Sequence, residues 1–254
     1  MTTSSTHTDP YIILYGISWE QYEKILDALG ECHLRHAYTE GTLEMRALLY
    51  GVSWEAYQQF LDAMGDHCPR HSYNGDTLEM MSPRKDHDWR KKLIGRMIEL
   101  MTFELNIPIQ SVGSTTLSGK HVEKGIQPDE AYYIANERLV RGKRDFDPDK
   151  DPPPDLTIEV DVTSSCVKRM PLFAQLGIPE VWRHDQQRLI FYRLTDDGDY
   201  EEIASSLAFP FLGSTDMNRF LDRWEATDEH SLLREFIDWV KQQPIPENGN
   251  TTNP

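Results

Sequence analysis

The chain has 254 residues, of which 39% are hydrophobic and 10% aromatic, and this composition suffices to bury the core of one large domain. Its polar N-terminus and the lack of a run of roughly 20 apolar residues argue against a signal peptide and a membrane span. The net charge of −16 disfavours binding of nucleic acid over the whole surface, and three widely separated cysteines predict reduced thiols in a cytoplasmic protein, with neither disulfides nor a zinc site.

The charge is unevenly distributed along the chain. Residues 81–200 contain 18 of the 26 lysines and arginines and have a net charge of −2, whereas residues 1–80 and 201–254 carry −8 and −6. An acidic protein with this distribution can still present one locally basic face.

A tandem repeat fills the N-terminal part of the chain. Residues 13–47 and 48–82 align without gaps, with 18 of 35 positions identical, which indicates a duplication. Each copy predicts a helix with a serine cap, Ser18 or Ser53, followed by a hairpin. Two repeats are too few for a solenoid, so we expect one copy to belong to the core and the other to form an added surface layer or an element of a homodimer.

The remaining pattern predicts a mixed α/β domain over residues 48–240, with residues 1–12 and 241–254 disordered and residues 13–47 as the added copy. Apolar residues recur at helical spacing or in short strand-like runs. The expected helices are 86–106, 169–177 and 230–240, and the expected strands are 109–117, 128–134, 155–162, 179–185 and 188–194.

Three carboxylates in the predicted strands suggest a metal site. Glu159 and Asp161 are two residues apart on one strand and so share a face, and Asp129 begins another strand. Carboxylates that converge in this way suit Mg²⁺ or Mn²⁺, which polarises a phosphodiester and activates water. The same alternation also suits a half-exposed strand with one polar face, and the spacing alone leaves both interpretations open.

Two long motifs resemble those of a known family. The runs PDEAYYIANERLVRG and PPPDLTIEVDVTSS, with KRMPLFAQLGIPEVWRHD after them, are similar to the Uma-two family, which is classed among the endonucleases of the PD-(D/E)XK superfamily. The resemblance covers at least residues 48–240. It implies a restriction-endonuclease-like αβββαβ core, with Asp129 as the aspartate of the motif and Glu159 as the acidic residue of its E-x-K element.

The sequence departs from that motif at the lysine. The position two residues after Glu159 is Asp161, so the cation that stabilises charge on the phosphate has to come from elsewhere. The family resemblance points to the start of the next predicted helix, where Arg169 matches by its distance from Gly177 and Lys168 is its neighbour. Arginine stabilises charge but stays protonated, so it is a poor base.

Weaker candidates surround this site. The family tends to carry a histidine where His87 lies, at the entrance to the first core helix; it would bind phosphate or assist proton transfer, or else be a capping or surface residue. Glu79 would be an outer metal ligand, although its repeat partner Glu44 has no core after it. We expect the four histidines of the repeats to be ordinary surface or hairpin residues, namely His33, His36, His67 and His71.

These observations support two hypotheses. The first is a Mg²⁺-dependent DNA endonuclease in which Asp129, Glu159 and Asp161 bind the metal and Lys168 or Arg169 stabilises the phosphate. The second is a catalytically inactive nuclease-fold protein that binds nucleic acid or a protein partner. A weaker third is an interaction module that assembles through the duplicated segment. The sequence does not decide whether the substrate is DNA or RNA. The observation that distinguishes the nuclease from the inactive protein is a cationic head group placed against the carboxylates.

Overall fold

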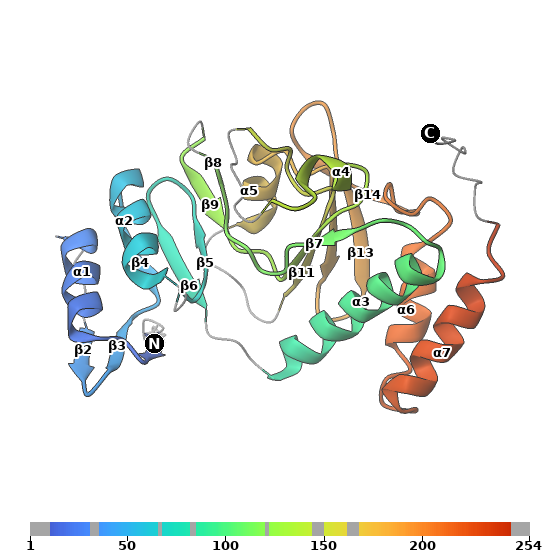
Figure 1. Ribbon diagram of the computed structural model, residues 1–254, viewed down its shortest axis with the longest axis horizontal. Coiled ribbons are helices and arrows are strands. Elements are labelled where there is room, and N and C mark those ends of the chain that lie inside the picture. Colours follow the sequence, from blue (N-terminus) through green and yellow to red (C-terminus); the bar gives the residue numbers. More distant parts are fainter. Residues whose placement is uncertain are drawn as a thin grey trace, which may run out of the picture.

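The computed structural model describes residues 11–30, 36–65, 68–81, 85–119, 122–143, 150–161 and 168–244. The expected disordered segments 1–12 and 241–254 lie largely outside these residues, although the first strand already begins at Tyr11. The repeat copies occupy one end of the molecule and the C-terminal helices the other, with the main sheet between them (Figure 1). Among the described residues, no helix combines the length and the apolar character that crossing a membrane requires.

The main sheet has the strand order β14-β13-β12-β11-β10-β7. Its only parallel pair among the described strands is β11 with β12. The strands are β7 (Gln110–Ser111), β10 (Glu130–Tyr133), β11 (Leu156–Val160), β12 (Glu180–His184), β13 (Leu189–Leu194) and β14 (Tyr200–Ile203). Helix α5 (Arg169–Gln175) connects β11 to β12, as a parallel pair requires.

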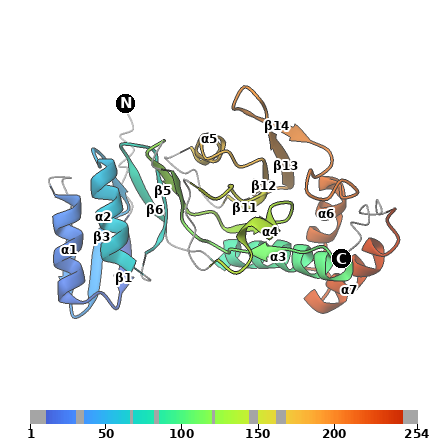
Figure 2. The same ribbon diagram turned by 45° about the horizontal axis from the view of Figure 1, so that its top comes forward.

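The helices complete the expected core. Helix α3 (Lys85–Glu104) precedes β7, so the order α3-β7-β10-β11-α5-β12 is the αβββαβ arrangement that the sequence predicts. The strands β8 (Leu117–Gly119) and β9 (Lys124–Ile126) are inserted before β10, and the short helix α4 (Glu137–Val140) follows it. Figure 2 shows α3 and α5 on opposite sides of the sheet. The two helices α6 (Ser214–Leu221) and α7 (Glu229–Val240) pack on the α3 side.

Strand β11 is buried on both faces. Leu156, Ile158 and Val160 belong to the cluster beneath α3, whereas Thr157 and Glu159 face the other way and are 0% and 2% exposed. The alternative interpretation of this segment as a half-exposed strand with one polar face is therefore wrong. Because α5 and the inserted strands cover the second face, Glu159 needs a partner inside the protein.

The two repeat copies fold alike. The first forms the sheet β1-β3-β2 with helix α1, and the second forms β4-β6-β5 with helix α2. Ser18 and Ser53 cap the helices, as the sequence predicts: their side chains accept hydrogen bonds from the backbone N–H groups of Gln21 and Ala56. The elements are β1 (Tyr11–Tyr15), α1 (Trp19–Leu29), β2 (His36–Thr39), β3 (Thr42–Arg46), β4 (Leu48–Leu49), α2 (Trp54–Met64), β5 (Arg70–Tyr73) and β6 (Leu78–Met81).

The second copy is joined to the main domain through its sheet. Strand β5 pairs with β9, and the close approach there depends on Gly125, because a Cβ at this position would lie 2.0 Å from Tyr57 Oη. The first copy pairs with no other described strand outside its own sheet. Its apolar side chains nevertheless share one cluster with the second copy, as Ile25 and Phe60 show, so the boundary near Leu48 stays a prediction.

His71 lies in the β5–β6 hairpin, as expected, but it is buried in this joint and not at the surface. It is 0% exposed on β5; its Nδ1 donates to Pro69 O at 2.9 Å, and its Nε2 accepts from Tyr57 Oη at 2.9 Å. Burial lowers the pKa of His71 to about 4. His36 is exposed, and His33 and His67 lie outside the described residues.

We expect His71 to make the protein sensitive to mild acid. Its pKa is about 4 in the folded chain against an ordinary 6.5, so between these values the unfolded chain binds a proton that the folded chain does not. The free energy of unfolding should thus fall as the pH drops through this window, by up to roughly 3 kcal/mol. Urea titrations at several pH values across the window should show that the free energy of unfolding changes less with pH in His71→Gln than in the parent. An equal dependence on pH in the two proteins would contradict the assignment.

A chain that begins at Leu48 should keep the main domain folded. It retains the β5–β9 pairing but loses the half of the shared cluster that the first copy supplies, so the second copy should become less stable. Hydrogen exchange should show protection in α3 and β11 like that of the full chain and faster exchange in α2. Complete unfolding would show instead that the first copy completes the core.

Candidate active site

Asp129 and Glu159 lie together on the α5 side of the sheet. Asp129 directly precedes β10, and two hydrogen bonds fix it to β11: its N–H donates to Ile158 O at 3.1 Å, and Val160 N–H donates to its Oδ2 at 2.7 Å. The two carboxylates are 1% and 2% exposed. The structure thus brings together the two acidic residues that the motif predicts.

Arg169 directs its guanidinium at Glu159. As the first residue of α5, it places Nε 2.6 Å from Glu159 Oε1 and Nη2 3.0 Å from Oε2. The same group donates to Ser72 Oγ at 2.5 Å and to Gln127 O at 2.6 Å. The expected position of a cation at the start of this helix is confirmed for Arg169. Lys168 is exposed and forms no ion pair with either carboxylate among the described residues.

A second arginine, which the sequence did not reveal, bridges the two carboxylates. Arg70 lies at the start of β5, with Nη1 3.0 Å from Asp129 Oδ1 and Nη2 2.6 Å from Glu159 Oε1. Because Arg35 occupies the same position in the first copy, Arg70 looks like a feature of the repeat. The usable signal was electrostatic, since two buried carboxylates require cationic partners.

Asp161 turns toward a different partner. Its Oδ2 accepts from Arg183 Nε at 2.8 Å and from Nη2 at 2.5 Å, and its N–H donates to His184 O. The side chain of Asp161 is 23% exposed. In the part of the chain that the structure describes, no three acidic, histidine or cysteine side chains are placed to hold a metal ion.

The weaker candidates are only partly defined. His87 belongs to the first turn of α3, and its side chain lies outside the described residues. Glu79 lies on β6 opposite Ser72, whose hydroxyl accepts from Arg169, so it stands one strand away from the cluster.

The cluster of Asp129, Glu159, Arg70 and Arg169 is formally neutral, with two negative and two positive groups. Burial raises the pKa of Glu159, and the attraction of Arg169 and Arg70 opposes that effect. Burial alone would lower the pKa of Arg70, but attraction to Glu159 and Asp129 raises it above its usual value, so Arg70 stays charged. Burial lowers the pKa of Arg169, and the attraction of Glu159 opposes that effect.

The carboxylates offer the right donor atoms for a divalent ion but not in this arrangement. Asp129 Oδ2 accepts from Val160 N–H, Asp129 Oδ1 and Glu159 Oε1 face Arg70, and Glu159 Oε2 faces Arg169. An ion shared by the two carboxylates would have to occupy the place of the Arg70 guanidinium. As the side chains stand, they do not fit a metal.

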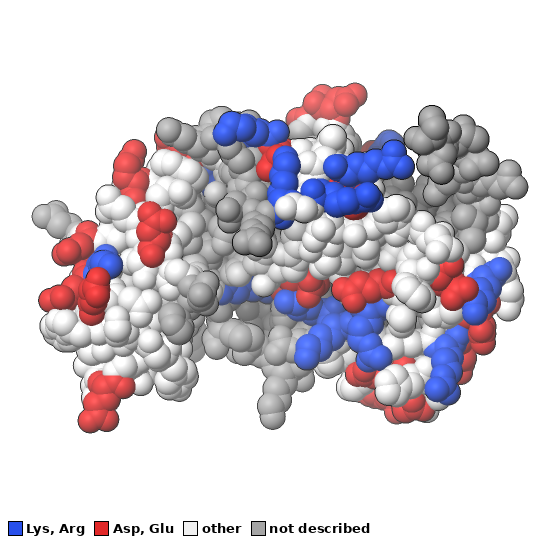
Figure 3. Space-filling view, in the orientation of Figure 1, with Lys and Arg blue, Asp and Glu red and all other residues white. Residues whose placement is uncertain are grey.

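Basic side chains gather near the first half of the main domain. Figure 3 shows blue side chains together with red ones over the region of α3, whereas the end formed by the repeat copies is largely red. Arg90, Lys91 and Lys92 belong to α3, and Lys91 lies 3.4 Å from Glu130, the residue after Asp129. The uneven charge along the sequence therefore becomes an uneven charge in space.

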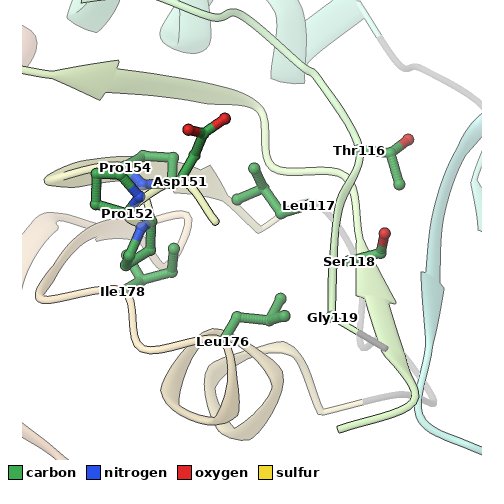
Figure 4. A pocket seen from close by; sticks show the side chains of 10 residues that line it. Thr116, Leu117, Ser118, Gly119, Asp151, Pro152, Pro154, Leu176 and Ile178 are labelled. Carbon is green, nitrogen blue, oxygen red and sulfur yellow. The ribbon is translucent and has the colours of Figure 1, made fainter. Parts of the chain in front are cut away.

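A separate cavity of about 110 Å³ lies away from the cluster (Figure 4). Three prolines, 152–154, form one wall, and Leu117, Leu176 and Ile178 form others. None of the four residues of the cluster lines this cavity, so the cavity is separate from the candidate active site.

We expect Glu159→Gln to destabilise the fold strongly. The change leaves the buried Arg169 and the partly buried Arg70 facing a neutral amide, and breaking a buried ion pair in this way costs about 3–5 kcal/mol. In the control Glu201→Gln, an exposed pair with Arg193 is lost, which should cost less than about 1 kcal/mol. Urea denaturation measures both, and similar small losses would show that Glu159 carries no buried charge.

A comparison with protein families identifies the same family that the sequence resembles. A family model named Uma2, with the description "Putative restriction endonuclease", matches residues 54–227. No curated protein matches the chain significantly. Among solved structures, the chain is similar to one from Anabaena variabilis described as "a putative nuclease belonging to DUF820". The two are 13% identical, with 72% of this chain and 97% of that chain covered and a TM-score of 0.44.

Proposed function

Because the chain belongs to the Uma2 family, we propose that it is an endonuclease that hydrolyses phosphodiester bonds of DNA at the cluster of Asp129, Glu159 and Arg169. The observation that carries the proposal is the contact between Arg169 and Glu159. A cation reaches the motif glutamate although the motif lysine is absent, because α5 supplies it from outside the strand.

The residues of the cluster divide the work. Asp129 joins β10 to β11 and fixes the position of the second carboxylate. Glu159 is the acidic group nearest to both cations, and Arg169, held by Ser72 and Gln127, keeps it oriented and ionised. A fixed guanidinium beside the reaction centre lowers the energy of the extra negative charge on the phosphate in the transition state.

Restriction-endonuclease-like families generally use divalent metal ions, and we propose Mg²⁺ or Mn²⁺ here. When bound, such an ion would polarise the phosphate and activate water. Asp129, Glu159 and Asp161 are the residues that we propose would hold it, although in the present arrangement their oxygens contact donors of the protein. We also propose that Lys168 assists Arg169 in stabilising the phosphate, that His87 binds phosphate or assists proton transfer, and that the protein acts in the cytoplasm.

One observation favours a second candidate function. The carboxylate oxygens already have protein partners, and the cluster is neutral without any ion. A nuclease fold whose site has closed in this way would bind nucleic acid or a protein partner without cleaving it, and the first repeat copy would be a natural element for assembly, for example as a homodimer.

A cleavage assay separates the two candidates. Incubation of single- and double-stranded DNA and RNA with Mg²⁺ or Mn²⁺ should give products that a chelator abolishes. Arg169→Ala should lower the rate by about two orders of magnitude or more, in the range found when a charge-stabilising donor is removed. Arg169→Lys keeps the charge and should be intermediate, and Arg193→Ala, an exposed control, should match the parent.

Thermal melting should accompany each variant, so that a lost rate is not confused with a lost fold. If the parent cleaves none of the substrates but binds DNA in a salt-dependent way, the binding-module function replaces the nuclease.

A further inference from the structure

The duplication places the same group of aromatic rings in both repeat copies. The first aromatic cluster consists of Trp19, Tyr22, His36 and Tyr38, and the second aromatic cluster consists of Trp54, Tyr57, His71 and Tyr73. The two tyrosines of each cluster stack, with ring centroids 4.6 Å apart in the first and 4.4 Å apart in the second. The two clusters therefore have the same geometry, and each can serve as a guide to the other.

The two clusters differ in what covers them. In the second copy β9 pairs with β5, and both tyrosines, Tyr57 and Tyr73, are 0% exposed. In the first copy β2 corresponds to β5, and it pairs with β3 but with no further strand in the part of the chain that the structure describes. Trp19 is 59% exposed there. The first copy thus presents the kind of surface on which the second copy carries a strand.

Strand β9 shows which chemistry this surface accepts. Gly125 lies against Tyr57, where a Cβ would be 2.0 Å from the tyrosine Oη, so the close approach requires glycine. The side chain of Lys124, the residue before it, donates to Asn74 O at the hairpin turn. A strand that covers such a cluster therefore carries a basic residue followed by glycine.

The first copy adds a carboxylate at the place where that basic residue would lie. Glu40 occupies the repeat position of Gly75, which follows Asn74, and it is exposed. Residues 13–47 contain six acidic and three basic side chains, and the repeat end of the molecule is largely red in Figure 3. A lysine or arginine in the place of Lys124 would thus meet the Glu40 carboxylate as well as the backbone of the turn.

A second copy of the chain matches this surface poorly. Strand β2 has the sequence His-Ala-Tyr-Thr, without a glycine to lie against Tyr22, and two acidic repeat ends repel each other. Strand β9 of a second copy would already pair with its own β5. The chemistry therefore favours a strand from a different protein.

We propose that the outer edge of β2 and the first aromatic cluster form a docking site for an extended segment of another protein, in which lysine or arginine precedes a glycine and an apolar residue follows it. The segment would extend the sheet β1-β3-β2 by one strand, as β9 extends the sheet at β5. Backbone hydrogen bonds, such as that from Gln127 N–H to His71 O at 3.1 Å in the second copy, would supply affinity, and the glycine and the cation would supply specificity. This role is independent of the nuclease.

The test uses a peptide with the sequence of β9 as the probe. A fluorescein-labelled peptide of residues 122–127, Val-Glu-Lys-Gly-Ile-Gln, should bind the full chain saturably in fluorescence anisotropy. The peptide Gly125→Val should bind about tenfold more weakly or worse, because its side chain would meet Tyr22. The protein variant Glu40→Lys should bind the parent peptide about fivefold more weakly. Its control Glu23→Lys, with the same charge change on exposed α1, should bind like the parent.

Hydrogen exchange shows where the peptide binds. The peptide should slow exchange in β2 and leave β5 unchanged. Slower exchange in β5 alone, equal binding of the parent and Gly125→Val peptides, or no binding at all would overturn the proposal, and the peptide comparison does not depend on whether a protein variant folds. A parent that sediments as a dimer, with β2 already protected before the peptide is added, would also overturn it, because a second copy would then occupy the edge.

Discussion

A carboxylate buried within a sheet needs hydrogen-bond donors or cations around it, and for Asp129 and Glu159 this requirement ties together the parts of the molecule. Asp129 and Glu159 come from the middle of the main sheet, Arg169 from the crossover helix, and Arg70 from the second repeat copy. The second repeat copy, which continues into the main domain, thus contributes a residue to the site. Its pairing with β9 is what brings Arg70 within reach of the sheet.

The same requirement explains which residues of the motif are fixed and which are not. Asp129 is locked by two backbone hydrogen bonds to the neighbouring strand, so it cannot change partner without disturbing the sheet. Asp161 follows the end of β11; its N–H still bonds to His184 O of β12, but its carboxylate binds Arg183 on that strand.

The sequence was sufficient for the features that depend on local pattern. Ser18 and Ser53 cap their helices because capping involves residues three apart, and the core order followed from family motifs that span it. Arg169 was found by its distance from Gly177. The sequence was insufficient where a partner comes from far away. Arg70 was hidden by its counterpart Arg35 in the other copy, and the burial of His71 depends on β9, which no local pattern links to β5.

The contact between Arg70 and Glu159 joins residues that are 89 positions apart in the chain. During synthesis residue 70 leaves the ribosome before residue 159, and the apolar cluster that the repeat copies share can begin to form before β11 is complete. Until then the guanidinium of Arg70 can stay hydrated, and a hydrated guanidinium carries no desolvation cost. Glu159 is made later, so it can be buried together with a cation that is already present. The order of the segments along the chain therefore favours burial of Glu159 together with Arg70.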